Sequence, residues 1–181
     1  MDKSSIAADS LFPTVNLNAL QYLARVKVAN VVCYLDFDGV LHGPNVYRHP
    51  RDGITLGGAN SAGRRLFEHA RSLEDVLQPF PQVRIVLSTD WVRRLGFSRT
   101  RSFLPSLLAA RVIGATYHAA AHGRDDVMRN SFEQSSRAEQ ILADVKRRRP
   151  ISWFAIDDDT SDWPDAHRSN LIECTGDSGL G

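Results

Sequence analysis

Lysine is scarce in this sequence. Only Lys3, Lys27 and Lys146 are lysines, and every other basic residue is an arginine. The 22 basic residues nearly balance 21 acidic residues, so the formal net charge is +1, which argues against a globally basic nucleic-acid binder and leaves only local patches open. The arginine bias reflects either genomic composition or phosphate handling, since guanidinium groups pair bidentately with phosphate oxygens.

Cysteine and long apolar runs are also scarce. Cys33 and Cys174 have neither the number nor the spacing of a zinc site or of a secreted disulfide framework, so we expect two buried thiols. No stretch reaches the roughly 18 uncharged apolar residues of a membrane helix, and the opening MDKSSIAADS has no apolar block of the signal-peptide type. We therefore expect a cytoplasmic protein without a membrane partner.

The rest of the composition is that of one ordinary folded domain. The chain has 181 residues, of which 43% are hydrophobic, and a compact domain typically has about 100 to 200 residues. Residues 1–28 are predicted to form a polar arm that includes a short amphipathic helix over 17–27. Residues 29–181 are predicted to form the domain itself.

Short apolar runs alternate with helical patterns along this domain. Strands are predicted over residues 31–37, 83–88, 151–157 and 171–175. Helices are predicted over residues 60–78 with Asn60 or Ser61 as N-cap, 91–101, 103–112 with Pro105 in the first turn, and 135–149 with Ser135 or Ser136 as N-cap. A loop or small hairpin is expected over 42–58, and a short strand and a loop over 114–132. The alternation predicts a three-layer α/β fold with a central parallel sheet.

Polar residues follow three of these strands. Asp36 and Asp38 end the first, Ser88 and Thr89 follow the second, and an acidic run, 157–159, ends the third. Sites in parallel sheets lie outside the carboxyl ends of the strands, so these groups are expected to converge. Two carboxylate clusters at one edge would repel each other unless a cation lies between them.

The order of these residues resembles that of the haloacid dehalogenase (HAD) phosphohydrolase superfamily. The segment DFDGVL, over 36–41, matches the first motif of that family, and Ser88, Arg137 and the segment WFAIDDD follow in the order of the other three. LSTDW and IDDD resemble the small HAD domains associated with RNA repair proteins. The resemblance covers about residues 31–175. It implies a Rossmann-like α/β/α catalytic domain without a large cap.

The resemblance also implies roles for individual residues. Asp36 would attack phosphorus and form an aspartyl phosphate, Asp38 would act as general acid and then general base, and Ser88 would donate a hydrogen bond to the phosphoryl group. Mg²⁺ would be the cofactor. Its ligands would be Asp36, the Asp38 carbonyl and Asp157, with Asp158 binding the ion directly or supporting a ligand, while Asp159 and Asp162 remain alternatives.

The third motif departs from the usual family pattern, which has a lysine at this position. Lys3 and Lys27 precede the nucleophile strand and Lys146 lies near the far end of its predicted helix, so no lysine is suitably placed. Arg137 is expected to carry this charge, with Arg124 as the alternative donor.

The predicted function is a Mg²⁺-dependent phosphatase. The segments between the motifs are too short for a large cap, so the site should be open to an extended substrate such as a nucleic-acid end, a nucleotide or a phosphoprotein. A catalytically silent binding or regulatory module and a phosphotransferase are the alternatives.

Three further groups of residues have more than one interpretation. The arginines either bind along a polyanion or form a solvated face, and the tryptophans either stack on bases or pack in the protein. The histidines have no spacing typical of metal ligands. These residues are Arg93, Arg94, Arg99 and Arg101, Trp91, Trp153 and Trp163, and His42, His49, His118 and His122.

Overall fold

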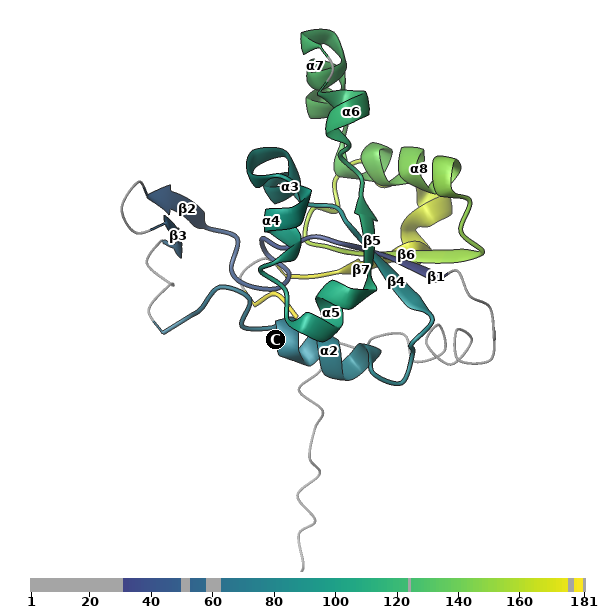
Figure 1. The fold of residues 1–181 in the computed structure, drawn as a ribbon. Helices are drawn as coiled ribbons and strands as arrows, with labels where there is room; N and C mark the ends of the chain where they lie inside the picture. Colours follow the sequence, from purple (N-terminus) through teal and green to yellow (C-terminus); the bar gives the residue numbers. More distant parts are fainter. Residues whose placement is uncertain (1–30, 50–52, 58–62, 124, 176–177, 181) are drawn as a thin grey trace, which may run out of the picture.

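A computed structural model describes residues 31–49, 53–57, 63–123, 125–175 and 178–180. Its centre is a five-stranded parallel sheet in the order β5-β4-β1-β6-β7 (Figure 1). The strands are β1 Val31–Leu35, β4 Val83–Leu87, β5 Val112–Ala115, β6 Ser152–Asp157 and β7 Leu171–Glu173. The predicted α/β fold with a central parallel sheet is therefore confirmed, whereas the helix predicted over 17–27 lies outside the described residues.

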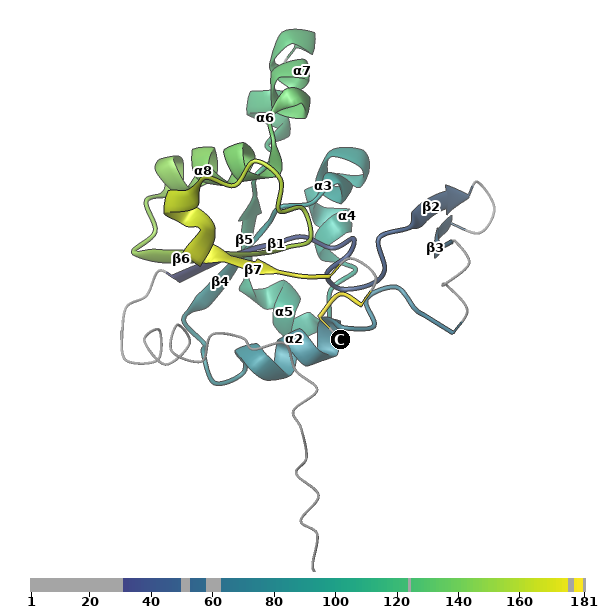
Figure 2. The ribbon, with the colours of Figure 1, turned by 180° about the vertical axis from the view of Figure 1, so that it is seen from behind.

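Strand β1 lies in the middle of the sheet and is buried along its whole length. Cys33 and Leu35 pack in one core with α2, Ala70–Leu77, and α5, Ser106–Arg111. Val32 and Tyr34 pack in a second core with α8, Arg137–Arg148, on the opposite face. Figures 1 and 2 show the helices on the two faces, which explains why the run VVCYL is apolar without alternation.

Helix α8 begins and ends as its sequence predicts. Ser136 is the N-cap, and its side chain and that of Glu139 form a reciprocal capping box. The last turn is basic, which suits the negative end of the helix dipole, and Arg149 ends the helix in the left-handed conformation before Pro150.

Both cysteines are buried free thiols, as expected. Cys33 lies in β1 and Cys174 follows β7, and β6 separates these two strands. Burial raises the pKa of each thiol, so neither is activated as a nucleophile.

The helix predicted over 60–78 is wrong in its first half. Helix α2 begins at Ala70, and the described residues before it, 63–69, form turns and irregular backbone. Phe67 takes a positive φ of 60°, which an α-helix does not permit. The proposed N-caps Asn60 and Ser61 lie outside the described residues and do not begin this helix.

The region from α5 to α7 also differs from the prediction. Helix α5 starts at Ser106 with Pro105 as its N-cap, and Val112 already belongs to β5. The residues after β5 form two short helices, α6 Ala119–His122 and α7 Asp126–Gln134, where a loop was expected. Asp125 caps α7 by accepting a hydrogen bond from Met128 N–H.

Two small insertions flank the sheet. The segment predicted as a loop or hairpin forms the antiparallel pair β2 Val46–His49 and β3 Gly53–Leu56, which lies at the left of Figure 1, whereas α6 and α7 project at the top. Between them lie α3, Asp90–Leu95, and α4, Phe97–Arg101, while the 3-10 helix η1, Asp165–Asn170, joins β6 to β7. Among the described residues no segment forms a large cap domain, and none of their helices is long and apolar enough to cross a membrane.

Candidate active site

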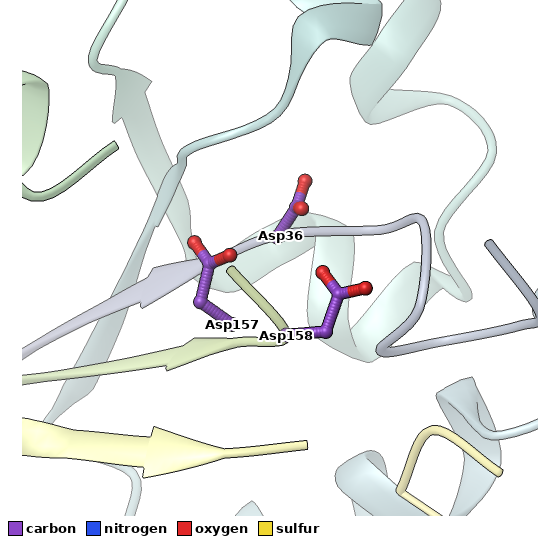
Figure 3. Close-up of side chains that lie close together, drawn as sticks. All are labelled: Asp36, Asp157 and Asp158. Carbon is purple, nitrogen blue, oxygen red and sulfur yellow. The ribbon is translucent and has the colours of Figure 1, made fainter. Parts of the chain in front are cut away.

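Three carboxylates meet at the carboxyl edge of the sheet. Asp36 directly follows β1, and Asp157 and Asp158 lie at the end of β6. The two strands are parallel neighbours, with Leu35 paired to Ile156, so their ends place these side chains together. One oxygen of each carboxylate lies within 4.8 Å of the others (Figure 3).

Burial makes this cluster electrostatically costly. Asp36 is 5% exposed and Asp157 is fully buried. Desolvation is the main cause that raises the pKa of both carboxyls, and the nearby Arg137 opposes the rise. Repulsion from Asp36 raises the pKa of Asp157 further, and repulsion from Asp38 and Asp158 raises that of Asp36. The pKa of Asp158 is also raised, mainly by burial. A cation among these oxygens would remove the penalty, and an oxygen-only donor set suits a hard divalent ion such as Mg²⁺.

Arg137 supplies the positive charge on the other side of the cluster. It is the first residue of α8, and the capped start of that helix directs it at the sheet edge. Its Nη2 lies 3.7 Å from Asp36 Oδ2, and its Nε lies 3.4 Å from Asp157 Oδ2. Although burial disfavours the charged guanidinium, these two carboxylates raise its pKa. Arg124, the alternative donor, lies outside the described residues.

Ser88 lies directly after β4 with its side chain fully buried. Its backbone N–H donates to Leu35 O at 2.8 Å, which holds the serine next to Asp36. Thr89 is the N-cap of α3, and its hydroxyl accepts a hydrogen bond from Trp91 N–H. The backbone of Ser88 is therefore fixed between β1 and α3, while its hydroxyl is free to bind a ligand.

The buried side-chain atoms that lack a hydrogen-bond partner gather at this edge. Within the described residues they are Ser88 Oγ, Arg137 Nε and Asp157 Oδ2. A buried polar atom without a partner costs about 1 to 3 kcal/mol, so such atoms are rare unless a ligand satisfies them. The Ser88 hydroxyl lacks any hydrogen bond, and Arg137 Nε and Asp157 Oδ2 have only their mutual ion pair at 3.4 Å, which fits a site that binds an anion together with a cation.

Gly39 allows Asp158 to reach the cluster. It has a φ of 71°, and an added Cβ would lie 2.0 Å from Asp158 Oδ2. Both the backbone conformation and the space thus require glycine in the turn after Asp38.

The other two aspartates of the acidic run do not join the cluster. Asp159 Oδ1 accepts a hydrogen bond from Ser161 N–H and organises the local turn. Asp162 is exposed and takes a left-handed conformation with a φ of 58°. Of the alternatives that the sequence left open, Asp157 and Asp158 are the pair that lies beside Asp36.

Asp38 has two partners whose role the sequence did not reveal. Its Oδ1 lies 3.0 Å from His42 Nε2 and accepts a hydrogen bond from Trp91 Nε1 at 2.9 Å. His42 had no recognisable ligand spacing, and Trp91 was ambiguous between stacking and packing. The only indication in the sequence was the position of these residues, because His42 directly follows the first motif and Trp91 follows Ser88 of the second motif by three residues.

A cavity of about 560 Å³ opens beside Asp38. Its walls mix apolar and charged side chains from the β2–β3 hairpin and from α3: Val46, Ile54, Trp91 and Leu95 lie beside Asp90 and Arg94. The cavity lies on the side of Asp38 that the hairpin covers. It therefore offers space for an organic group attached to a phosphate at the sheet edge.

Most of the arginines that follow the second motif have protein partners. Arg93 forms ion pairs with Asp90 and Glu133, Arg94 pairs with Asp90, and Arg101 donates to Ala109 O. Of these side chains only Arg94 contributes to the wall of the cavity.

The remaining candidate rings belong to other contacts. Trp153 and Trp163 stack on each other, with ring centroids 6.4 Å apart, and Trp163 is buried in the core that contains α8. His118 lies 2.9 Å from Arg147 Nη2, and His122 packs on Phe132. Packing is thus the observed arrangement of these two tryptophans, and neither histidine belongs to the carboxylate cluster.

Comparison with protein families gives one match. A family model for the HAD domain in Swiss Army Knife RNA repair proteins matches residues 32–181, which include the whole carboxylate cluster. This match confirms the resemblance that the four motifs suggested. No match was found among curated proteins or among solved structures.

Proposed function

Because the chain belongs to the family of HAD domains found in Swiss Army Knife RNA repair proteins, we propose that it is a Mg²⁺-dependent phosphomonoesterase that works through an aspartyl phosphate. The observation that carries this proposal is the convergence of three carboxylates with Arg137 and the unpartnered hydroxyl of Ser88. In an ion-pair network with a purely structural role, the buried hydroxyl of Ser88 would be expected to have a hydrogen bond. A phosphoryl site needs donors and a cation at the same edge.

The first chemical step transfers the phosphoryl group to the protein. A carboxylate oxygen of Asp36 attacks phosphorus, the bond from phosphorus to the ester oxygen breaks, and Asp38 gives a proton to the departing oxygen. The Ser88 hydroxyl donates to a phosphoryl oxygen. Arg137 balances the negative charge that the phosphate brings to Asp36, which it approaches to 3.7 Å.

The second step releases inorganic phosphate. Asp38 removes a proton from a water molecule, whose oxygen attacks phosphorus and displaces Asp36. The proton lost to the first product is thereby replaced, and both carboxyls return to their starting states.

Mg²⁺ would be held by the carboxylates of Asp36, Asp157 and Asp158 and by the backbone carbonyl of Asp38. These residues fit the ion, because their oxygens are hard ligands and Asp157 Oδ2 is buried without another partner. The ion supplies the charge that lets an anionic phosphate approach a carboxylate nucleophile.

The cavity beside Asp38, which has both apolar and charged walls, supports a substrate with an organic leaving group that carries both apolar and polar parts. Asp38 protonates the leaving oxygen, so the group attached to that oxygen would lie between the hairpin and α3, next to Val46, Ile54 and Trp91. Because the described residues form no large cap domain, there is room for an extended substrate. We therefore propose a phosphorylated nucleic-acid end as the substrate, with nucleotides and phosphoproteins as the competing substrates.

The test is hydrolysis of p-nitrophenyl phosphate and of a phosphate panel that includes 3′- and 5′-phosphorylated RNA and DNA, nucleotides and a phosphopeptide. Each is assayed with Mg²⁺ and with EDTA, for the wild type and for Asp36→Asn. Activity that requires both Mg²⁺ and Asp36 is the expected result. An inactive wild type on the whole panel would mean a catalytically silent binding module, and phosphate appearing on an added alcohol would mean a phosphotransferase.

A further inference from the structure

We propose that His42 and Trp91 are positioning residues for Asp38, which they hold by Oδ1 so that Oδ2 exchanges the proton with the leaving group and with water. This inference rests on the proposed phosphatase function and adds two residues to it. Its basis is the set of contacts around one carboxylate oxygen, which accepts from both side chains at 3.0 and 2.9 Å.

The hydrogen bonds of His42 define which ring nitrogen carries its proton. The ring is fully buried, and Nδ1 accepts the backbone N–H of Phe67 at 3.3 Å. A backbone N–H can only donate, so Nδ1 must be the nitrogen without a proton. The proton therefore lies on Nε2, which donates to Asp38 Oδ1.

Trp91 supplies the second donor from a different part of the chain. An indole Nε1–H can donate but cannot accept, and it lies 2.9 Å from the same Oδ1. The ring is 4% exposed and comes from the first turn of α3, which starts just after Ser88. The contact thus connects Asp38, which follows β1, to the end of β4, where Ser88 would donate its hydrogen bond to the phosphoryl group.

The two donors are themselves held by an aromatic cluster. The ring of Phe67 lies 4.8 Å from that of His42 and 5.4 Å from that of Trp91, and Phe37 and Phe103 contact the same tryptophan. Phe67 adopts a left-handed backbone conformation, which is strained for a bulky residue. In that conformation, both the backbone N–H and the ring of Phe67 contact His42. The irregular turn before α2 thus helps to hold His42, and through it the carboxylate of Asp38.

A purely structural role for these residues would affect all substrates equally, whereas a positioning role would not. A misplaced general acid harms substrates whose leaving oxygen is basic, and it has little effect where the leaving group departs without a proton. Phenyl phosphate and 2,4-dinitrophenyl phosphate provide this contrast. The ratio kcat/KM is the appropriate measure, because it includes the steps only up to departure of the leaving group.

The main variant is Trp91→Phe, which keeps an aromatic ring and removes the donor. Because Trp91 also lines the cavity beside Asp38, both esters can lose some activity, but we expect kcat/KM for phenyl phosphate to fall about tenfold or more beyond the loss for 2,4-dinitrophenyl phosphate. Trp153→Phe is the matched control, since Trp153 is a half-buried indole that stacks on Trp163 and has no contact with Asp38. It should change kcat/KM for neither ester. Equal losses on both esters would overturn the inference.

A second pair of variants and a spectroscopic measurement cover the case in which Trp91→Phe folds poorly. His42→Gln retains an amide donor and should keep more activity on phenyl phosphate than His42→Ala. In a ¹H–¹⁵N spectrum, Asp38→Ala should shift the indole signal of Trp91 and leave those of the other two tryptophans in place. An unmoved Trp91 signal refutes the contact at any level of activity. An inactive wild type refutes the phosphatase and this inference together, whereas an active wild type with uniform variant effects refutes only the inference.

Discussion

Replacing Asp157 by asparagine should stabilise the metal-free protein while it abolishes activity. The side chain is fully buried beside Asp36, and burial with repulsion from that carboxylate raises its pKa to about 8. The unfolded chain has the ordinary value of 3.8. Asparagine has nearly the same shape and no charge, so it removes the cost of the buried acid.

The magnitude follows from the difference between the two pKa values. At pH 7 the unfolded side chain is ionised, and about three pKa units separate pH 7 from its ordinary value. At about 1.4 kcal/mol per unit, the penalty on the native state is at most about 4 kcal/mol. Part of this penalty belongs to Asp36, whose pKa is raised in the same cluster. We therefore expect Asp157→Asn to raise the free energy of unfolding by about 1 to 3 kcal/mol, which corresponds to a rise of about 3 to 9 °C in Tm.

The gain in stability should depend on pH. A carboxyl with a raised native pKa destabilises the fold when pH exceeds its unfolded pKa, so its stability contribution is complete below about pH 4 and is lost as pH rises to about 8. The advantage of Asp157→Asn in EDTA should therefore be largest near pH 8 and should disappear near pH 4. Mg²⁺ should reverse the order, because it stabilises the wild type and binds the variant poorly.

The assay is thermal unfolding of both proteins between pH 4 and 8, in EDTA and in Mg²⁺. Asp126→Asn is the control, because its carboxylate is exposed and remote from the cluster. A variant that is less stable than the wild type in EDTA at pH 8, or whose advantage does not change with pH, would refute the reasoning about burial.

Three other changes test individual parts of the site and its support. Arg137→Ala should reduce kcat/KM for p-nitrophenyl phosphate by about a hundredfold, with Arg137→Lys less affected, because only the positive charge near Asp36 is restored; equal losses would show that the guanidinium shape is required. Gly39→Ala should weaken Mg²⁺ binding, measured by calorimetry, because its Cβ would displace Asp158, and unchanged affinity would exclude Asp158 from the metal site. Ser136→Ala should lower the free energy of unfolding by about 1 kcal/mol in a urea titration, because it removes the capping box of α8, and no change would show that the box contributes nothing.

The sequence was sufficient for the strands and for the order of the site motifs. The buried run before Asp36 and the capped helix that starts at Arg137 are local patterns, and local patterns depend on nearest neighbours along the chain. Parallel strands bring their carboxyl ends to one edge, so the meeting of Asp36 with Asp157 followed from the predicted topology alone.

Other features depended on contacts between distant residues. The helix predicted over 60–78 begins only at Ala70, because the ring and the N–H of Phe67 contact His42, and no local pattern in the residues before α2 indicates a left-handed phenylalanine. Likewise, Trp91 lies far from Asp38 in the sequence, and only packing brings its indole nitrogen to that carboxylate.

The same distinction applies to the acidic run after β6. Its composition predicts a cation site but does not say which carboxylates face it, because the direction of a side chain in a turn depends on the turn itself. The turn organised by Asp159 leaves Asp158 above Gly39 and Asp162 in solvent. The sequence alone thus predicted the fold class and the meeting of carboxylates at one edge of the sheet, whereas the tertiary structure decided which side chains form that cluster, since hydrogen bonds and packing between separated segments orient them.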